Sequence, residues 1–328
     1  MTPTPVLDPN AVQTLISAGG AAPSIHNTQP WRFTVDPQTR TVTVHAAWER
    51  SLPLADAKGR ALHVSVGAAI FNLMVAARHL EWEPILHLLP RSSDPGLLAE
   101  VRMAGPPLTG RTPGPDLYEA IAQRRSSRLP FTGCRVPPAV VDELTAAART
   151  EGAELSLPGA AESARLLELT ADAELRRTTD HERLHETRSW LREPDKGPYG
   201  VPYTALGPRD ARAHVPMRDF TGQDPVHWQP SAAFEEHPKL ALLSTCDDRA
   251  ADWLRAGQAL EHVLLLLTSH GLRASMLYQA LEWHDLRWLL RDPLSPGLGQ
   301  PQMLLRIGYG PQGPPTPRRP AQGTPTDG

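Results

Sequence analysis

Apolar residues recur at helical spacing in several stretches, and each stretch ends in residues that suit a helix terminus. Residues 60–80 are apolar almost throughout, which predicts a helix buried on nearly every side. Asp8 and Pro9 predict the start of an earlier helix that Gly19 and Gly20 end. Asp116 is predicted to cap a helix that runs to Arg124. Two further helices are predicted from Pro138 to Thr150 and from Asp248 to His270. Gly152 and Gly271 follow them as stop signals.

Shorter β-rich runs predict strands. Trp31–Val35 and Thr41–His45 flank the turn-forming residues Asp36–Pro37, which predicts a hairpin. Leu240–Thr245 precedes the last long helix, and Met303–Ile307 closes the pattern. The mixture of helices and strands predicts an α+β fold.

A Pro- and Gly-rich break at residues 104–115 separates two parts, which we take as an N-terminal half (1–111) and a C-terminal half (112–328). Gly67-Ala-Ala and Gly257-Gln-Ala resemble one another, each at the start of a long apolar helix. The halves are therefore predicted to be approximate copies of one unit. An insert at about 179–228 holds six prolines and little apolar periodicity, and a lid over a site is one interpretation.

The overall charge excludes some classes of partner. The 328 residues hold 33 Lys and Arg against 36 Asp and Glu, a net charge of −3, which argues against nucleic-acid and anionic-membrane binding. All but three of the 33 basic residues are Arg, whose planar fork suits phosphate groups. Two cysteines give neither a disulfide framework nor a metal cluster. With no targeting signal and no apolar run longer than Val263–Leu267, we expect a cytoplasmic protein.

Two conspicuous motifs are not expected to function. Residues 181–185 match HExxH, the helix motif of zinc proteases, but their flanks are polar, so an exposed helix face is predicted and a zinc hydrolase is a distant alternative. Residues 308–313 match GxGxxG, yet a dinucleotide site requires a helix to follow. That helix is forbidden by Pro311, Pro314, Pro315 and Pro317.

Three segments concentrate hydrogen-bond donors. Residues 22–32 pack Ser, His, Asn, Thr and Gln between two prolines, although an ordinary loop could look the same. Residues 124–128 read Arg-Arg-Ser-Ser-Arg, which suits a phosphate dianion or, alternatively, a basic helix C-terminus. Arg318–Arg319 follow the last strand, and a tail folded back would complete a phosphate clamp.

Together these segments resemble the nitroreductase superfamily over nearly the whole chain. PSxxNxQPW is matched from Pro23 to Trp31, RRSxR from Arg124 to Arg128, and RIGYG at 306–310. Residues 218–220 and 252–261 are similar to the Acg-type FMN-binding branch. The resemblance implies a nitroreductase-like α+β fold whose two fused, pseudo-symmetric halves mimic the family homodimer.

The resemblance also implies a flavin site. The first half lacks RRSxR and the second lacks PSxxN, so one FMN is expected per chain, between the halves. Arg124, Ser126 and Arg128, with Arg318 or Arg319, are expected to hold its phosphate. Backbone amides of the later turn are expected near flavin N5 and O4. The full set of expected cofactor-binding residues is Pro23, Ser24, Ile25, His26, Asn27, Thr28, Arg124, Arg125, Ser126, Arg128, Met276, Leu277, Tyr278, Arg318 and Arg319.

The implied activity is NAD(P)H-dependent reduction of nitro- or quinone-type small molecules, with no catalytic side chain because the flavin carries the electrons. A non-enzymatic protein that binds or stores FMN under a closed lid is the alternative. No metal is expected, and a fused pair favours a monomer over a homodimer.

Overall fold

The computed structural model describes residues 6–105, 116–193, 197–222, 229–291, 299–320 and 324–325. The helices are α1 (Pro9–Gly20), α2 (Arg60–His79), α3 (Tyr118–Gln123), α4 (Pro138–Thr150), α5 (Ala160–Thr179), α6 (His181–Ser189), α7 (Ala250–Ser269) and α8 (His284–Leu289), with short 3-10 turns η1 (Ile25–Asn27), η2 (Trp48–Arg50), η3 (Tyr203–Ala205) and η4 (Gln279–Glu282).

Two separate sheets dominate the strands. The first has the order β13-β1-β2-β4-β3 and the second has the order β11-β12-β10-β5. The strands are β1 (Trp31–Asp36), β2 (Thr41–Ala46), β3 (Pro84–Leu88), β4 (Leu97–Met103), β5 (Glu154–Ser156), β10 (Lys239–Thr245), β11 (Arg273–Met276), β12 (Gln300–Gly308) and β13 (Thr324–Pro325), with short pairs β6 (Leu191–Arg192) with β7 (Val201–Pro202) and β8 (Arg209–Asp210) with β9 (Ser231–Ala232).

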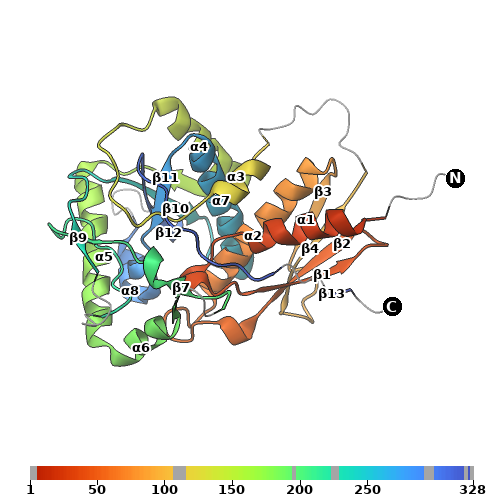
Figure 1. Cartoon of the computed structure of the whole chain (residues 1–328), viewed down its shortest axis with the longest axis horizontal. Helices are drawn as coiled ribbons and strands as arrows, with labels where there is room; N and C mark the ends of the chain where they lie inside the picture. Colours follow the sequence, from red (N-terminus) through yellow and green to blue (C-terminus); the bar gives the residue numbers. More distant parts are fainter. Residues whose placement is uncertain are drawn as a thin grey trace.

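Helices α2 and α7 join the two sheets. Helix α2 packs on the first sheet, α7 packs on the second, and the two helices pack on one another between them (Figure 1). Gly67 and Gly257, each the eighth residue of its helix, meet at the contact. A Cβ on Gly67 would lie 2.1 Å from the carbonyl oxygen of Leu254, and one on Gly257 would lie 2.1 Å from that of Val64. Only glycine permits this approach.

The sequence predicted most of this frame. The helices at 9–20, 60–79 and 138–150 and the first hairpin are confirmed. Asp8 accepts from the backbone N–H of Ala11, as a cap should. The predicted position of the two glycine motifs was wrong, because both lie in the middle of their helices.

Two predicted helix starts are also corrected. Helix α7 begins at Ala250, because the carboxylate of Asp248 instead binds Arg287 at 2.7 and 2.8 Å. Helix α3 is preceded by Leu117 as its N-cap, and Asp116 accepts from the N–H of Tyr118. The break at 104–115 lies almost wholly outside the described residues, so the division at 111/112 stays a prediction.

Helix α2 has the length and hydropathy of a membrane span, but 94% of the relevant window is buried within the fold. It is therefore accounted for as a core helix of the protein, in agreement with the burial predicted for residues 60–80.

The chain after β12 returns to the first half. No helix follows Gly308 among the described residues up to 320, in agreement with the rejection of GxGxxG as a dinucleotide motif. The tail crosses the molecule, and Thr324 and Pro325 pair with Thr34 and Val35 of β1. This crossing carries Arg318 past the loop that precedes β1.

Candidate functional site

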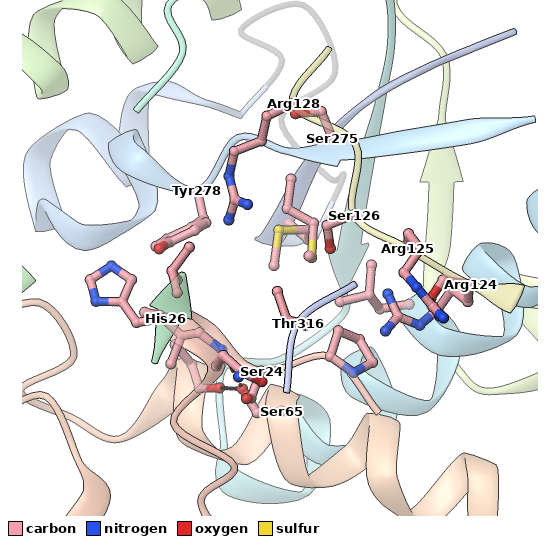
Figure 2. Close-up of a pocket in the computed structure, with 18 of the residues that line it drawn as sticks. Ser24, His26, Ser65, Arg124, Arg125, Ser126, Arg128, Ser275, Tyr278 and Thr316 are labelled. Atoms are coloured by element: carbon pink, nitrogen blue, oxygen red, sulfur yellow. Dashed lines mark hydrogen bonds between the residues drawn. The ribbon is translucent and has the colours of Figure 1, made fainter. Parts of the chain in front are cut away.

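A cavity of about 260 Å³ lies where the two halves meet. One water needs roughly 10–15 Å³, so the cavity can accommodate an organic molecule. Its walls come from the loop around η1, from α2 and α7, from residues 121–128, from the end of β11, from the insert and from the C-terminal tail (Figure 2). The structure thus brings the Pro23–Asn27 loop and the Arg-rich segment, a hundred positions apart, to one site.

The loop before β1 has an unusual backbone. His26, Asn27 and Gln29 have φ angles of 47°, 55° and 50°, in the left-handed region that costs non-glycine residues energy. Ser24 Oγ accepts from the N–H of Gln29 at 2.9 Å, and Ser65 Oγ of α2 accepts from that of Ile25 at 3.2 Å. These bonds hold the backbone of the loop in place at the wall of the cavity.

Asn27 connects the loop to two distant segments. Its Nδ2 donates to the carbonyl oxygens of Gly200 in the insert, at 2.9 Å, and of Pro317 in the tail, at 3.0 Å. Its Oδ1 accepts from Arg318 Nη1 at 2.9 Å. One buried amide thereby holds the insert and the tail against the wall of the cavity.

The Arg-rich segment is held against the second sheet. Ser126 forms a parallel bridge with Ala274 of β11, and the N–H of Ser127 donates to the Ala274 carbonyl at 2.9 Å. Since β11 runs directly into Leu277 and Tyr278, this bridge places the segment beside the Met276–Tyr278 stretch at the cavity.

One end of the cavity is cationic. Arg124, Arg125, Ser126 and Arg318 all contribute to its wall. Burial, followed by the nearby charge of Arg124, lowers the pKa of Arg318 to about 9. Behind them lies Glu261 of α7, fully buried, with Oε1 3.5 Å from Arg124 Nε. Burial raises the pKa of Glu261 to about 7 against the opposing effect of Arg124. This end can bind an anion such as a phosphate.

Arg128 does not join that end. Its guanidinium lies 5.1 Å from the ring centre of Phe220, and its Nη1 donates to the carbonyl of Ala205. Four residues of extended chain separate the Cα atoms of Arg124 and Arg128 by about 13 Å, and the Phe220 and Ala205 contacts hold the Arg128 guanidinium at the insert. In Figure 2 Arg128 points toward Tyr278 and His26, away from Arg124 and Arg125. The structure thus places the Arg128 guanidinium away from the cationic end, and the expectation that it holds the same phosphate stays a prediction.

Two other expected residues are not part of the cavity wall. Thr28 is completely buried and does not line the cavity. Arg319 turns away, with its guanidinium 5.4 Å from the ring centre of Tyr199 and its N–H donating to Gln29 Oε1. Of the two tail arginines, Arg318 is the one that lines the cavity. The other expected residues all line the cavity: Pro23, Ser24, Ile25, His26, Asn27, Arg124, Arg125, Ser126, Arg128, Met276, Leu277, Tyr278 and Arg318.

Several lining residues were not expected. The insert contributes Val201, Met217, Arg218 and Phe220. The similarity of residues 218–220 to the Acg-type branch is the signal in the sequence for a role of this segment at the site. The remaining additions come from the residue after α1, both long helices, α3, β11, β12 and the tail. They include Arg60, Val64, Ser65, Leu260, Ser275, Met303, Pro314 and Thr316.

The HExxH motif lies away from this site, on α6. His181 and His185 are both exposed, as predicted for a solvated helix face. Within the described ranges, no three His, Cys, Asp or Glu side chains gather as a metal site would require.

Comparison with known proteins identifies the family. The chain is 34% identical over 323 residues to "Putative NAD(P)H nitroreductase Rv3131" of Mycobacterium tuberculosis, covering 95% of this chain and 90% of the relative. It is 28% identical over 330 residues to "Putative NAD(P)H nitroreductase acg" of the same organism, covering 97% and 96%. No family model matches the chain.

Among solved structures, a Bacteroides fragilis nitroreductase with bound FMN has a TM-score of 0.35 and 14% identity, over 60% of this chain and 90% of that one. A likeness of this degree adds nothing to the assignment, which rests on the sequence relatives. The chain belongs to the nitroreductase superfamily, in its Acg-type branch.

Proposed function

We propose that this protein binds one FMN in the cavity and uses NAD(P)H to reduce electron-poor small molecules of the nitro or quinone type. The observation that carries the proposal is the pairing of a cationic end, at Arg124, Arg125, Ser126 and Arg318, with a largely apolar cavity beyond it. The names of the relatives, NAD(P)H nitroreductases, agree with this activity.

The residues present fit the phosphate of FMN. Within the described part of the chain, the one ionic partner of Arg124 is the buried Glu261, at 3.5 Å, and Arg124 Nε lacks a hydrogen-bond partner there. A buried donor without a partner is costly, and a phosphate oxygen would relieve that cost. Ser126 would add a hydroxyl donor beside it.

The rest of the cavity fits a flat ring system. Ile25, Val64, Leu277 and Met303 supply apolar walls, and the Met276–Tyr278 backbone lies along one edge. FMN, when bound, supplies the two-electron chemistry, which leaves the protein to position the ring and exclude water.

The fused arrangement supports one flavin per chain. The loop and the tail come to the cavity from the first sheet's side, and residues 124–128 come from the second sheet's side. We therefore propose that the halves divided near residue 111 are copies of one unit and that a single chain, a cytoplasmic monomer, forms a complete site.

A direct test is the colour and content of the purified protein. We expect a yellow protein that releases FMN on denaturation. A colourless protein that takes up no added FMN would refute the proposal.

A second candidate, a non-enzymatic FMN-binding or storage protein, is favoured by one observation. The insert contributes Val201, Met217 and Phe220 to the cavity wall, and Gly200 is bonded to Asn27 in both directions. An insert held in this way covers the site, and a nicotinamide would need it to move.

Rapid mixing of the flavin-loaded protein with NADPH and, separately, NADH distinguishes the candidates. Loss of the flavin absorbance within seconds supports the reductase. A flavin that keeps its absorbance with both nucleotides, yet bleaches with dithionite, supports storage.

A further inference from the structure

The end of the cavity opposite Arg124 holds a second group of polar side chains that the flavin proposal does not require. His26 of η1 lines the cavity and is 3% exposed. Neither Nδ1 nor Nε2 of its ring has a hydrogen-bond partner within the described ranges. Buried polar atoms are nearly always paired, so an imidazole in this position indicates a ligand that is still to be supplied.

Arg218, from the insert, lies beside His26. Its Nη2 donates to Glu282 Oε1 at 2.7 Å, and its guanidinium lies 4.6 Å from the ring centre of Tyr278. The side chain is 5% exposed and lines the cavity, while Nε and Nη1 have no partner among the residues that the structure describes. The ion pair therefore fixes Arg218, and two of its buried N–H groups stay unpaired among the described residues.

The charges in this region do not balance. Three guanidinium groups, those of Arg128, Arg177 and Arg218, lie close enough to act on His26, and the carboxylates facing the cluster are Glu174 and Glu282. Burial, followed by the charges of Arg218 and Arg128, lowers the pKa of His26 well below its ordinary value, so the imidazole is neutral. Among the described residues, one positive charge in excess is buried without an acidic partner, which is unfavourable unless an anion binds.

We infer that His26, Arg218 and Arg128 form an anion subsite that binds a carboxylate, or a comparable oxyanion, of the reducible substrate. This inference rests on the proposed function. It assigns the substrate class as a planar, electron-poor molecule with an anionic group at one end. Two free Arg218 N–H groups and an imidazole suit a carboxylate, because charge-assisted hydrogen bonds are the strong ones. The flavin phosphate has its own donors at the other end.

The test titrates flavin-loaded protein, without reductant, with 4-nitrobenzoate and with the neutral 4-nitrobenzamide, and follows the flavin absorbance. We expect the carboxylate to bind at least tenfold more tightly. In the double variant Arg218→Met/Glu282→Gln, which removes a buried ion pair without leaving one charge unpaired, this preference should fall about tenfold. The variant Arg306→Met/Glu235→Gln is the matched control, because that ion pair is equally buried, joined at 2.6 Å, and not part of the cavity wall.

A second variant keeps the inference falsifiable if the double variant does not fold. Asn tolerates the left-handed backbone of residue 26, so His26→Asn should fold. In its flavin-loaded fraction the ratio of carboxylate to carboxamide affinity should fall several-fold. Equal binding of the two probes by flavin-loaded wild type would overturn the subsite while leaving the flavin proposal intact. A protein that takes up no flavin would overturn the proposed function itself.

Discussion

Arg318 Nη1 donates a 2.9 Å hydrogen bond to Oδ1 of Asn27, 291 positions earlier in the chain. The same guanidinium also reaches the carbonyl oxygen of Ala21 at 3.3 Å. These bonds hold the C-terminal tail across the cationic end of the cavity. The site is thus assembled from parts of the chain that only the complete fold brings together.

Arg318→Ala should weaken FMN binding about 10- to 100-fold, because charge-assisted bonds are worth roughly 1.5–3 kcal/mol. The affinity for riboflavin, which lacks the phosphate, should fall much less in the same variant. Arg319→Ala is the matched control, since Arg319 faces Tyr199, and it should change neither affinity more than about threefold. Fluorescence titration of flavin-free protein measures both ligands. Equal losses for FMN and riboflavin in Arg318→Ala would contradict the phosphate assignment.

Arg128→Ala should act differently from Arg318→Ala. Because Arg128 lies against Phe220, away from the cationic end, its removal should leave the ratio of FMN to riboflavin affinity unchanged. The same titrations give that ratio. A selective loss of FMN would restore Arg128 to the phosphate site.

Gly67→Ala should destabilise the protein by several kcal/mol, because the new Cβ meets backbone atoms of α7 that cannot move aside. Gly20→Ala is the control, since no atom lies within 4 Å of its added Cβ, and it should be neutral or slightly stabilising. Urea unfolding measures the difference. Similar midpoints for the two variants would contradict the close crossing of α2 and α7.

Glu261 should make stability depend on pH. Burial raises its folded pKa to about 7 from the ordinary 4.5, so its contribution is fully present below pH 4.5 and is lost as the pH rises to 7. The free energy of unfolding of Glu261→Gln, measured relative to that of wild type, should therefore rise by up to about 3 kcal/mol between pH 4.5 and pH 8. Unfolding of flavin-free protein at several pH values tests this.

The matched control is Glu154→Gln, which alters an exposed carboxyl group. The difference in free energy of unfolding between this variant and wild type should not change between pH 4.5 and pH 8. If the difference in free energy of unfolding between Glu261→Gln and wild type is also independent of pH, Glu261 is ionised over this whole pH range.

The sequence located the two central segments of the site because each is a local motif. PSxxN and RRSxR are short, and every residue that identifies them is adjacent in the chain. The motif alone could not reveal in which direction the chain continues after Arg124. The backbone there is extended and is bridged to Ala274, so it carries Arg128 to the far end of the cavity. The motif therefore predicts one ligand for Arg124 and Arg128, whereas the structure places their side chains apart.

Features that depend on tertiary contacts were not predicted. Strands β3 and β4 lack a strong alternating pattern, and α5 buries a stripe that includes the polar residues Ser163 and Thr170 beside Leu166. Arg218 lies in a Pro-rich stretch without periodicity, and its place at the cavity is set by the ion pair with Glu282. Such a position depends on a partner 64 residues away.

Calorimetric titration of FMN into flavin-free protein tests the central claim most directly, because it reports whether the cavity between the halves is a complete flavin site in a single chain. The account predicts saturable binding with one FMN per chain, and loss of affinity in Arg318→Ala. Absence of binding, or two FMN per chain, would contradict it.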